Sequence, residues 1–211
     1  MVQFLGSLEF VTCGSTFKLL NIQSGSRLHS HDVKYGSGSG QQSVTGTPNV
    51  DDHNSYWQVR GDTMSDCERG APIHCGDTVR LFHISTRRNL HSHNFVSPLS
   101  YNQEVSCYGE DGVGDEGDRW MVVCTDNNDV WQRRSDIRLQ HVVTKKYLHL
   151  TGDTYGRPIS GQKEICAYQN MNSQNIWRTE EGVFIRPSST DFSSGDNQSY
   201  RTKEEHSNDE L

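Results

Sequence analysis

Three stretches of the chain alternate between apolar and polar residues, or nearly so, as half-buried β-strands do. They are Phe17–Ile22, Val79–Ile84 and Ile137–Val142. A polar turn follows each stretch, and after the turn comes a second short strand ending on a Leu-His pair, which predicts three β-hairpins. No segment of about 12 residues has helical periodicity, so the sequence predicts no long helix.

An internal repeat determines the predicted architecture. A Leu-His pair, a glutamine and a tryptophan recur in the same order in three parts of the chain. They stand at positions 28/29, 42 and 57, then at 90/91, 103 and 120, and then at 148/149, 162 and 177. The middle copy is longer between its Gln and its Trp, and the extra residues fall in the acidic segment 110–118, as insertions in surface loops do.

Units of about 60 residues each are too small to bury a core alone, so we expect the three to share one. A third strand after Gly36–Gly40 and a fourth carrying the Trp complete the first unit, and the other two follow the same plan. Twelve short strands with approximate threefold symmetry, closed with few free edges, predict an all-β protein with the β-trefoil fold. The predicted parts are an extension at 1–8, a trefoil at 9–187 with repeats at about 9–70, 71–130 and 131–187, and a polar tail at 188–211.

Composition narrows the class of protein. The formal net charge of −7 argues against binding to the phosphate backbone of a nucleic acid. Seven Phe, four Trp and eight Tyr residues are spread along the chain, whereas disordered segments are poor in aromatics. No run approaches the roughly 20 apolar residues that cross a bilayer, so no membrane span is predicted.

Six cysteines occur without a Cys-x-x-Cys motif, so a zinc ribbon or a thioredoxin-type pair has no support. Their even number fits disulfides in an oxidising compartment, and buried free thiols are the alternative. The first and last strands of a trefoil unit are antiparallel neighbours, and two of the cysteines lie four residues after a repeated glutamine. The expected pairs are Cys13–Cys67, Cys75–Cys124 and, across two units, Cys107–Cys166. A Cys67–Cys75 bond is the main rival among the 15 pairings that six cysteines allow.

The chain ends on Asn208-Asp209-Glu210-Leu211, which is similar to the Lys-Asp-Glu-Leu retrieval signals and predicts localisation in the lumen of the endoplasmic reticulum (ER). Residues 1–9 lack the basic and apolar regions of a signal peptide, so we expect the sequence to represent a mature form. A single glycosylation sequon at Asn197 lies in the polar tail and is a possible modification site in that compartment.

The segment Arg27–Gly46 closely resembles the first MIR repeat of the stromal cell-derived factor 2 family, and Asn89–His93 and Tyr155–Glu164 share the resemblance. It covers about residues 9–187. It implies a non-enzymatic β-trefoil of the ER lumen that works with a J-domain co-chaperone and the major ER chaperone ATPase on misfolded or O-mannosylated client proteins. Family members usually end in His-x-Glu-Leu, whereas this chain has Asn208.

The candidate chemistry is sparse. Two His-Ser-His motifs, at 29–31 and 91–93, place two imidazoles on one face of a strand, but no third metal ligand is specified by spacing. We interpret the repeated Leu-His pair as a packing feature, because His149 has no second histidine at 151. Gly36–Gly40 is not followed by the Gly-Lys-Ser/Thr of a phosphate loop, and segment 110–118 lacks the spacing of a calcium loop. No nucleophile motif or cofactor signature is present, so neither an enzyme nor a cofactor is predicted.

Two hypotheses of different classes follow. The first is a protein-interaction module of ER quality control, expected to be monomeric by itself. The second is a carbohydrate-binding trefoil that recognises mannosyl groups, although only the outline of the Gln-x-Trp pattern of ricin-type lectins is present. For either role we expect exposed polar and aromatic groups around the repeated hairpins to form the binding surface. They are Arg27, His29, His31, Tyr35, His91, His93 and Tyr155.

Overall fold

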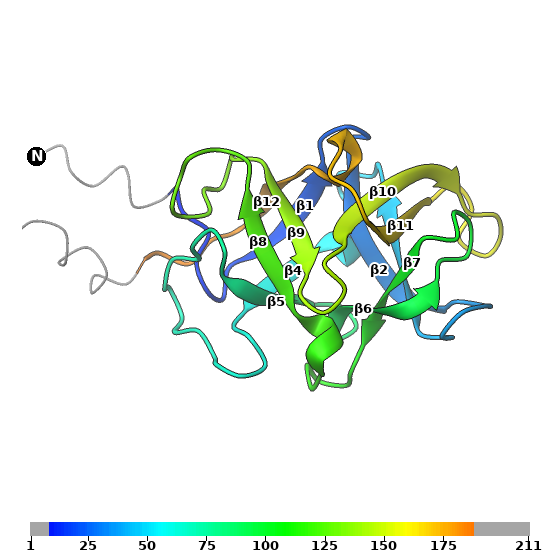
Figure 1. Cartoon of the computed structure of the whole chain (residues 1–211), viewed down its shortest axis with the longest axis horizontal. Helices are drawn as coiled ribbons and strands as arrows, with labels where there is room; N and C mark the ends of the chain where they lie inside the picture. Colours follow the sequence, from blue (N-terminus) through cyan, green and yellow to red (C-terminus); the bar gives the residue numbers. More distant parts are fainter. Residues whose placement is uncertain (1–8, 188–211) are drawn as a thin grey trace, which may run out of the picture.

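The computed structural model describes residues 9–187, and these form an all-β protein (Figure 1). The strands are β1 (Thr16–Asn21), β2 (Ser26–Lys34), β3 (Gln42–Thr47), β4 (Trp57–Arg60), β5 (Thr78–His83), β6 (Arg88–Val96), β7 (Gln103–Tyr108), β8 (Trp120–Cys124), β9 (Ile137–His141), β10 (Tyr147–Thr154), β11 (Lys163–Tyr168) and β12 (Trp177–Val183). Three short 3₁₀ helices precede every fourth strand: η2 (His53–Ser55), η3 (Glu116–Asp118) and η4 (Ser173–Asn175). The predictions of an all-β protein and of twelve strands are confirmed for this part of the chain.

All twelve strands belong to one closed antiparallel sheet. Strands β1, β4, β5, β8, β9 and β12 pair with one another in a ring, so that β12 returns to β1. The other strands form the hairpins β2–β3, β6–β7 and β10–β11 (Figure 1). Their second strands β3, β7 and β11 pair with each other in a triangle, so each hairpin is hydrogen-bonded to the other two.

The repeated tryptophans occupy the centre of the core. Trp57, Trp120 and Trp177 are fully buried, and a buried indole needs an acceptor for its N–H. Each donates to the carbonyl of the leucine in the Leu-His pair of its own unit, at 2.9 Å, 3.0 Å and 2.9 Å. The two landmarks recur together along the chain because they form this hydrogen bond.

A second set of equivalent positions, one in each unit, is joined by backbone hydrogen bonds. The sequence patterns did not predict this set. The backbone N–H of Val11 donates to Trp131, that of Trp131 to Ile73, and that of Ile73 back to Val11, at 2.8–3.0 Å. Three segments from three units thus form a cycle of hydrogen bonds. The side chains share only their apolar character, so no residue type marks the positions in the sequence.

Two of the expected disulfides are confirmed. Cys13–Cys67 and Cys75–Cys124 have Cα–Cα distances of 5.9 Å and 5.6 Å, within the usual range for disulfides. Two residues after Trp131, Arg133 stands where the first two units have Cys13 and Cys75, and its guanidinium stacks on the Phe184 ring at 3.9 Å. A cation–π contact therefore takes the place of the disulfide in the third unit.

The expected Cys107–Cys166 bond is wrong, because the third glutamine is one residue out of register. Cys107 lies opposite Leu90 and Cys166 opposite His149, so Ala167, opposite Leu148, is the true equivalent of Cys107. A shift of one residue along a strand turns a side chain to the other face of the sheet. Both thiols are free and buried, and burial raises the pKa of each to about 12. Neither is a ready nucleophile at neutral pH.

One of the glycines between β2 and β3, Gly38, packs against a buried carboxylate. Gly38 has a φ of +66°, and a Cβ there would collide with the carboxylate of Glu104 on β7. That carboxylate accepts hydrogen bonds from the hydroxyl and the backbone N–H of Ser39. At Gly38 the backbone therefore approaches a side chain of the second unit closely, whereas Gly36 and Gly40 have open space beside them.

Candidate functional site

Each unit packs a short 3₁₀ helix against the strand that carries its Leu-His pair, and the predicted histidines lie at this contact. The N-cap residues of η2, η3 and η4 are Asp52, Asp115 and Asn172. In η3 and η4 the N-cap side chain and the last helical residue form a reciprocal capping box. The three sites are thus variations on one local structure, and their differences show what each residue does.

In the first unit the two histidines bond to one another. His29 lies 2.7 Å from Asp52 through Nδ1 and 2.7 Å from His31 Nδ1 through Nε2. Burial and the neighbouring His29 lower the pKa of His31. For Asp52, burial acts to raise the pKa, but hydrogen bonds from Ser55 and His29 outweigh it and the pKa is lowered. At neutral pH this site therefore holds a neutral His31 and an ionised Asp52, with both ring nitrogens of His29 engaged.

In the second unit no hydrogen bond joins His91 to His93. His93 Nε2 lies 2.9 Å from the carboxylate of Glu104, whose equivalent in the first unit is Ser43. His91 Nδ1 lies 2.9 Å from the fully buried carboxylate of Asp118. In the neutral tautomer that donates Nδ1–H to Asp118, His91 Nε2 is a hydrogen-bond acceptor, and no residue between 9 and 187 donates to it.

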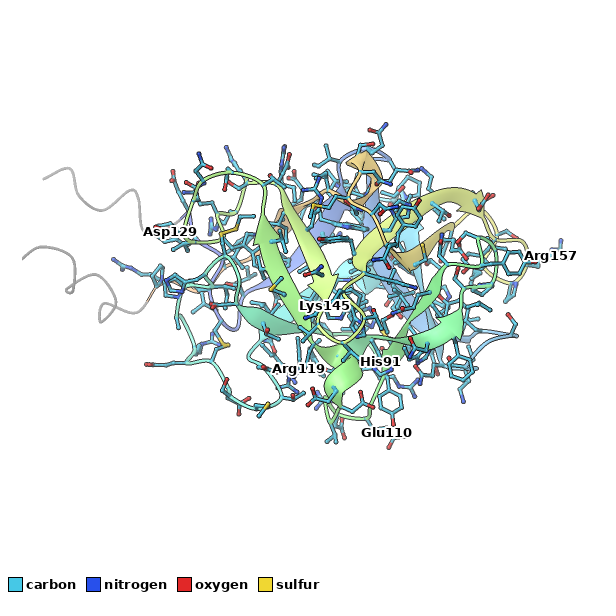
Figure 2. All side chains as sticks on the ribbon, viewed as in Figure 1. His91, Glu110, Arg119, Asp129, Lys145 and Arg157 are labelled. Carbon is cyan, nitrogen blue, oxygen red and sulfur yellow. A yellow bond between two sulfur atoms is a disulfide. The ribbon has the colours of Figure 1, made fainter. Side chains whose placement is uncertain are left out.

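A pocket of about 370 Å³ opens beside these histidines, between the second and third units. His91 lies close to the turn of the third unit that carries Lys145 (Figure 2). The wall combines imidazoles, carboxylates and one apolar side chain. The residues that line it are His91, Ser92, His93, Asn94, Asp115, Glu116, Gly117, His141, Val143 and Thr144. The chemistry suits a polar ligand that donates hydrogen bonds to His91 and to the carboxylates.

In the third unit one histidine remains, and the two capping carboxylates are replaced by amides, while Glu164 occupies the position of Glu104. Burial lowers the pKa of His149 to about 4, against the opposing charge of Glu164. Asn172 and Asn175 cap η4 in the same way as Asp115 and Asp118 cap η3. Donor atoms of His91, Asp115 and Asp118 lie within 4.8 Å of one another, as metal ligands would. Since amides perform the same capping in η4, the two acids are explained as helix caps.

Two further histidines, which were not among the predicted site residues, connect one unit to the next. His83 and His141 each hydrogen-bond a threonine three residues later, and each lies 2.9–3.1 Å from a carbonyl of the preceding unit's 3₁₀ segment. Those threonines also accept hydrogen bonds from Gln42 and Gln103. Burial lowers the pKa of both imidazoles to about 4. The repeated His-x-x-Thr spacing was the available signal.

The expected binding surface is largely inside the protein. The expectation of exposure is wrong for Arg27, His29, Tyr35 and His91, each at most 8% exposed, because their faces of the hairpins are covered by neighbouring strands and 3₁₀ helices. His31, His93 and Tyr155 are half-buried.

The buried members of the expected surface fall into separate places. Arg27 makes an ion pair with Glu181 at 2.5 Å. The Tyr35 hydroxyl lies within hydrogen-bond distance of carbonyls on β3 and β7, and its ring is 6.4 Å from that of Tyr155. The structure therefore brings His91 and His93 together in one pocket, His29 and His31 in another site, and the two tyrosines near the hairpin triangle. Asn197 and the ending Asn208–Leu211 lie outside the described residues.

Comparison with known proteins defines the class first. The model of the MIR domain matches residues 27–185. The SDF2-like protein of Arabidopsis thaliana has a crystal structure with a TM-score of 0.82 and 44% identity, covering 84% of this chain and 98% of that one. A protein O-mannosyltransferase Pmt1–Pmt2 complex from S. cerevisiae, bound to the sugar donor, has a TM-score of 0.72 and 28% identity over 86% of this chain and 28% of that one.

The sequence relatives define the family. Human stromal cell-derived factor 2 is 56% identical over 182 residues, which are 86% of this chain and 85% of that protein. The chain therefore belongs to the stromal cell-derived factor 2 family of MIR-domain proteins, as the repeated motifs predicted. Within residues 9–187 no helix is long and apolar enough to span a bilayer.

Proposed function

We propose that this protein is a non-enzymatic interaction module of the ER lumen, and that it acts in protein quality control within a complex of a J-domain co-chaperone and the ER chaperone ATPase. Its clients are misfolded or O-mannosylated proteins. The observation that carries the proposal is family membership at 56% identity, together with the retrieval-like ending Asn208–Leu211. The names of the relatives contain no enzymatic term.

The chemistry of the described residues supports a binding role. Burial raises the pKa of the two free thiols, Cys107 and Cys166, to about 12 and so keeps them protonated. The histidine–carboxylate pairs hold the 3₁₀ helices and hairpins together. Asp118, the partner of His91, also accepts hydrogen bonds from Asn89 and from the backbone of Asp115, so it serves as a structural anchor.

We also infer that the closed sheet is a β-trefoil. In each unit the first and fourth strands belong to the ring, and the second and third form the hairpin. Equivalent hydrogen bonds join the three tryptophans to the three Leu-His pairs. A threefold arrangement gives three related surfaces, and sequence differences between the units can give each surface a different ligand.

Co-purification tests the complex. The full chain with an epitope tag placed near its N-terminus, so that the C-terminus stays free, is expressed in the secretory pathway and cross-linked within the ER lumen. A J-domain protein and the chaperone ATPase are expected among the captured proteins. Capture of neither, while the tagged chain is folded and luminal, contradicts the proposal.

Localisation is tested separately at the last residue. Leu211→Ser removes the apolar end of the proposed signal, and the variant is expected in the culture medium while the parent chain stays in the cell. Equal secretion of both proteins contradicts the proposed retrieval signal. The charge-neutral change Ser207→Ala, just outside the four-residue ending, is the matched control.

Carbohydrate binding is the alternative that the second-unit pocket favours. The acceptor His91 Nε2 and the carboxylates Asp115 and Glu116 suit the hydroxyl groups of a mannosyl residue. The structural likeness to a protein O-mannosyltransferase complex adds support. A glycan array that includes mannosyl peptides tests it, with Asn94→Trp as the pocket-filling variant. Absence of any signal from the parent chain removes this alternative.

A further inference from the structure

Two arginines face each other directly across the boundary between the first and second units. Arg60 on β4 is paired in register with Arg80 on β5. Like charges at directly opposed positions of antiparallel strands are destabilising. At the next boundary the same register pairs Val123 with Arg138, so the doubled charge is particular to the β4–β5 boundary. Stability of the sheet alone gives no reason for it.

The surrounding carboxylates compensate this charge only weakly. Asp66 lies 3.5 Å from Arg80, and its side chain is 94% exposed. Asp111 pairs with the neighbouring Arg87 at 2.6 Å, and both of these side chains are exposed. Exposed ion pairs contribute little because water screens them. Arg80 and Arg87 therefore have carboxylate partners, whereas neither Arg60 nor Arg69 forms an ion pair with any residue between 9 and 187.

Arg60 is held in place without a carboxylate. Its Nε donates to Gln58 Oε1 at 2.9 Å, and its guanidinium stacks on the Phe82 ring at 3.4 Å. Burial, and then the charges of Arg80 and Arg87, lower the pKa of Arg60. Its terminal Nη groups make no ion pair with any residue in the range 9–187. A stacked, oriented guanidinium with free donors is prepared to bind an anion.

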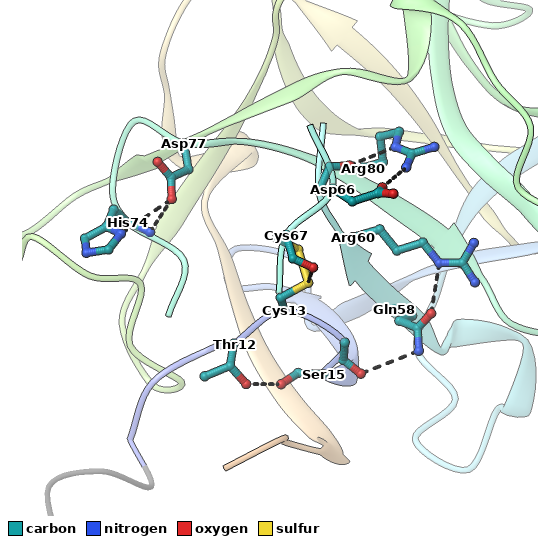
Figure 3. Close-up of a disulfide and its surroundings, with 12 residues drawn as sticks. Thr12, Cys13, Ser15, Gln58, Arg60, Asp66, Cys67, His74, Asp77 and Arg80 are labelled. Atoms are coloured by element: carbon teal, nitrogen blue, oxygen red, sulfur yellow. Dashed lines mark hydrogen bonds and ion pairs between the residues drawn. A yellow bond between two sulfur atoms is a disulfide. The ribbon is translucent and has the colours of Figure 1, made fainter. Parts of the chain in front are cut away.

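An open pocket of about 310 Å³ adjoins this arginine. Arg60, Asp66 and the exposed Arg69 line it, and the Cys13–Cys67 disulfide forms part of its wall. Figure 3 shows Arg60 and Asp66 near this disulfide. A Cβ at Gly61 would collide with the backbone of the segment that leads into Cys67, so the chain is tightly packed there. The disulfide and this packing hold in place the backbone segments that carry Arg60 and Arg69.

We propose that the surface formed by Arg60 and Arg69, with Arg87 beside them, binds an acidic peptide segment of a partner protein. The planar guanidinium fork matches the carboxylates of Asp and Glu. These three arginines lie on a strand, a loop and a turn rather than converging on one point, which fits several carboxylates in an extended chain. This surface is separate from the histidine pocket, and the inference does not depend on the proposed function.

Fluorescein-labelled hexaglutamate is the probe, and fluorescence anisotropy of the full chain at low ionic strength is the measurement. The parent chain is expected to bind, with an affinity that falls as salt is added. The variant Arg60→Gln/Arg69→Gln is expected to weaken binding by about tenfold or more, because it removes charge-assisted hydrogen bonds. Arg69→Gln alone, at an exposed side chain, gives a measurable decrease even if the double variant folds poorly.

Lys145→Gln/Arg157→Gln is the matched control, since it removes the same charge from two exposed side chains elsewhere (Figure 2). It is expected to bind as the parent does. An equal loss in this control would show that only net charge matters and would overturn the proposal. Failure of the parent to bind hexaglutamate would also overturn it. The proposal would likewise be overturned if inorganic phosphate displaced the labelled probe at the same concentration as unlabelled hexaglutamate does. None of these results depends on whether chaperones or glycans bind.

Discussion

At the scale of single residues, each repeated tryptophan is fixed by one hydrogen bond to a leucine carbonyl of its own unit. Trp57, Trp120 and Trp177 are all fully buried, so neither the indole N–H nor the carbonyl has water as an alternative partner. A buried polar group that loses its partner costs more than the net value of the bond. The sequence could predict the recurrence of these residues, but the partner of the indole depends on the folded hairpin.

Trp120→Phe tests this contact. Phenylalanine keeps the aromatic ring but removes the donor, so the carbonyl of Leu90 is left buried and unpaired. We expect the free energy of unfolding to fall by about 2–4 kcal/mol, from the lost hydrogen bond and the smaller ring. Urea unfolding followed by circular dichroism measures it. Stability within about 0.5 kcal/mol of the parent would contradict the role assigned to the indole N–H.

The buried imidazoles predict loss of stability in acid. The pKa of His141 falls from 6.5 to about 4 on burial, so the unfolded chain takes up its proton at a higher pH than the folded protein. The contribution of the neutral imidazole to the free energy of unfolding is fully present above about pH 6.5, and it is lost as the pH falls toward 4. His83 and His149 act in the same direction.

His141→Asn isolates one of these groups, because the first unit already has Asn21 at this position. Asn21 donates to the carbonyl of Gln174 at 2.8 Å and accepts from the backbone of Ser24, so an amide can fill the role. We expect stability at pH 7.5 to change by about 1 kcal/mol at most. The loss of stability between pH 6.5 and 4 should be smaller than in the parent chain. An unchanged pH dependence in urea unfolding would contradict the assignment.

At the scale of elements, the 3₁₀ helices explain why acidic residues gather beside the histidines. Asp115 Oδ1 accepts from the backbone of Gly117, as Asn172 accepts from Gln174 in the third unit. Charge is therefore not needed for this contact. The sequence marked the acidic segment as a loop, and the short helix within it was missed because three residues carry no periodicity.

Substitution at Asp115 separates capping from charge. Asp115→Asn keeps the acceptor and should alter the free energy of unfolding by less than about 0.5 kcal/mol, whereas Asp115→Ala should cost about 1 kcal/mol. Both are measured by urea unfolding. If the two variants are equally destabilised, the carboxylate has a role that capping does not explain.

Strand register is the element-level feature that the sequence predicted least well. The repeated Leu-His and Trp positions set the units correctly, since each marks a hydrogen-bonded pair. Gln162 was aligned with Gln103 although Lys163 occupies that place, opposite Gly46. One residue of error moved Cys166 to the wrong face and produced the incorrect third disulfide. A side-chain period of two makes register sensitive to a single-residue error.

At the scale of the whole molecule, three related units carry different surfaces on one closed sheet. The ring of strands and the hairpin triangle follow from the repeat, and so the fold could be predicted in outline. Contacts between units could not, because Glu104 reaches Ser39 and Arg60 faces Arg80 only once strands of different units are neighbours. Exposure of the candidate residues could not be predicted either, because the strands and 3₁₀ helices that cover Arg27, His29, Tyr35 and His91 become their neighbours only in the folded protein.

We propose that this protein works by binding a J-domain co-chaperone of the ER lumen, without transforming a substrate. Size-exclusion chromatography with light scattering, using the purified full chain and a purified luminal J-domain co-chaperone, tests it most directly. We expect a single peak containing both proteins, with a mass above that of either alone. Separate elution of two folded proteins at concentrations of tens of micromolar would contradict it.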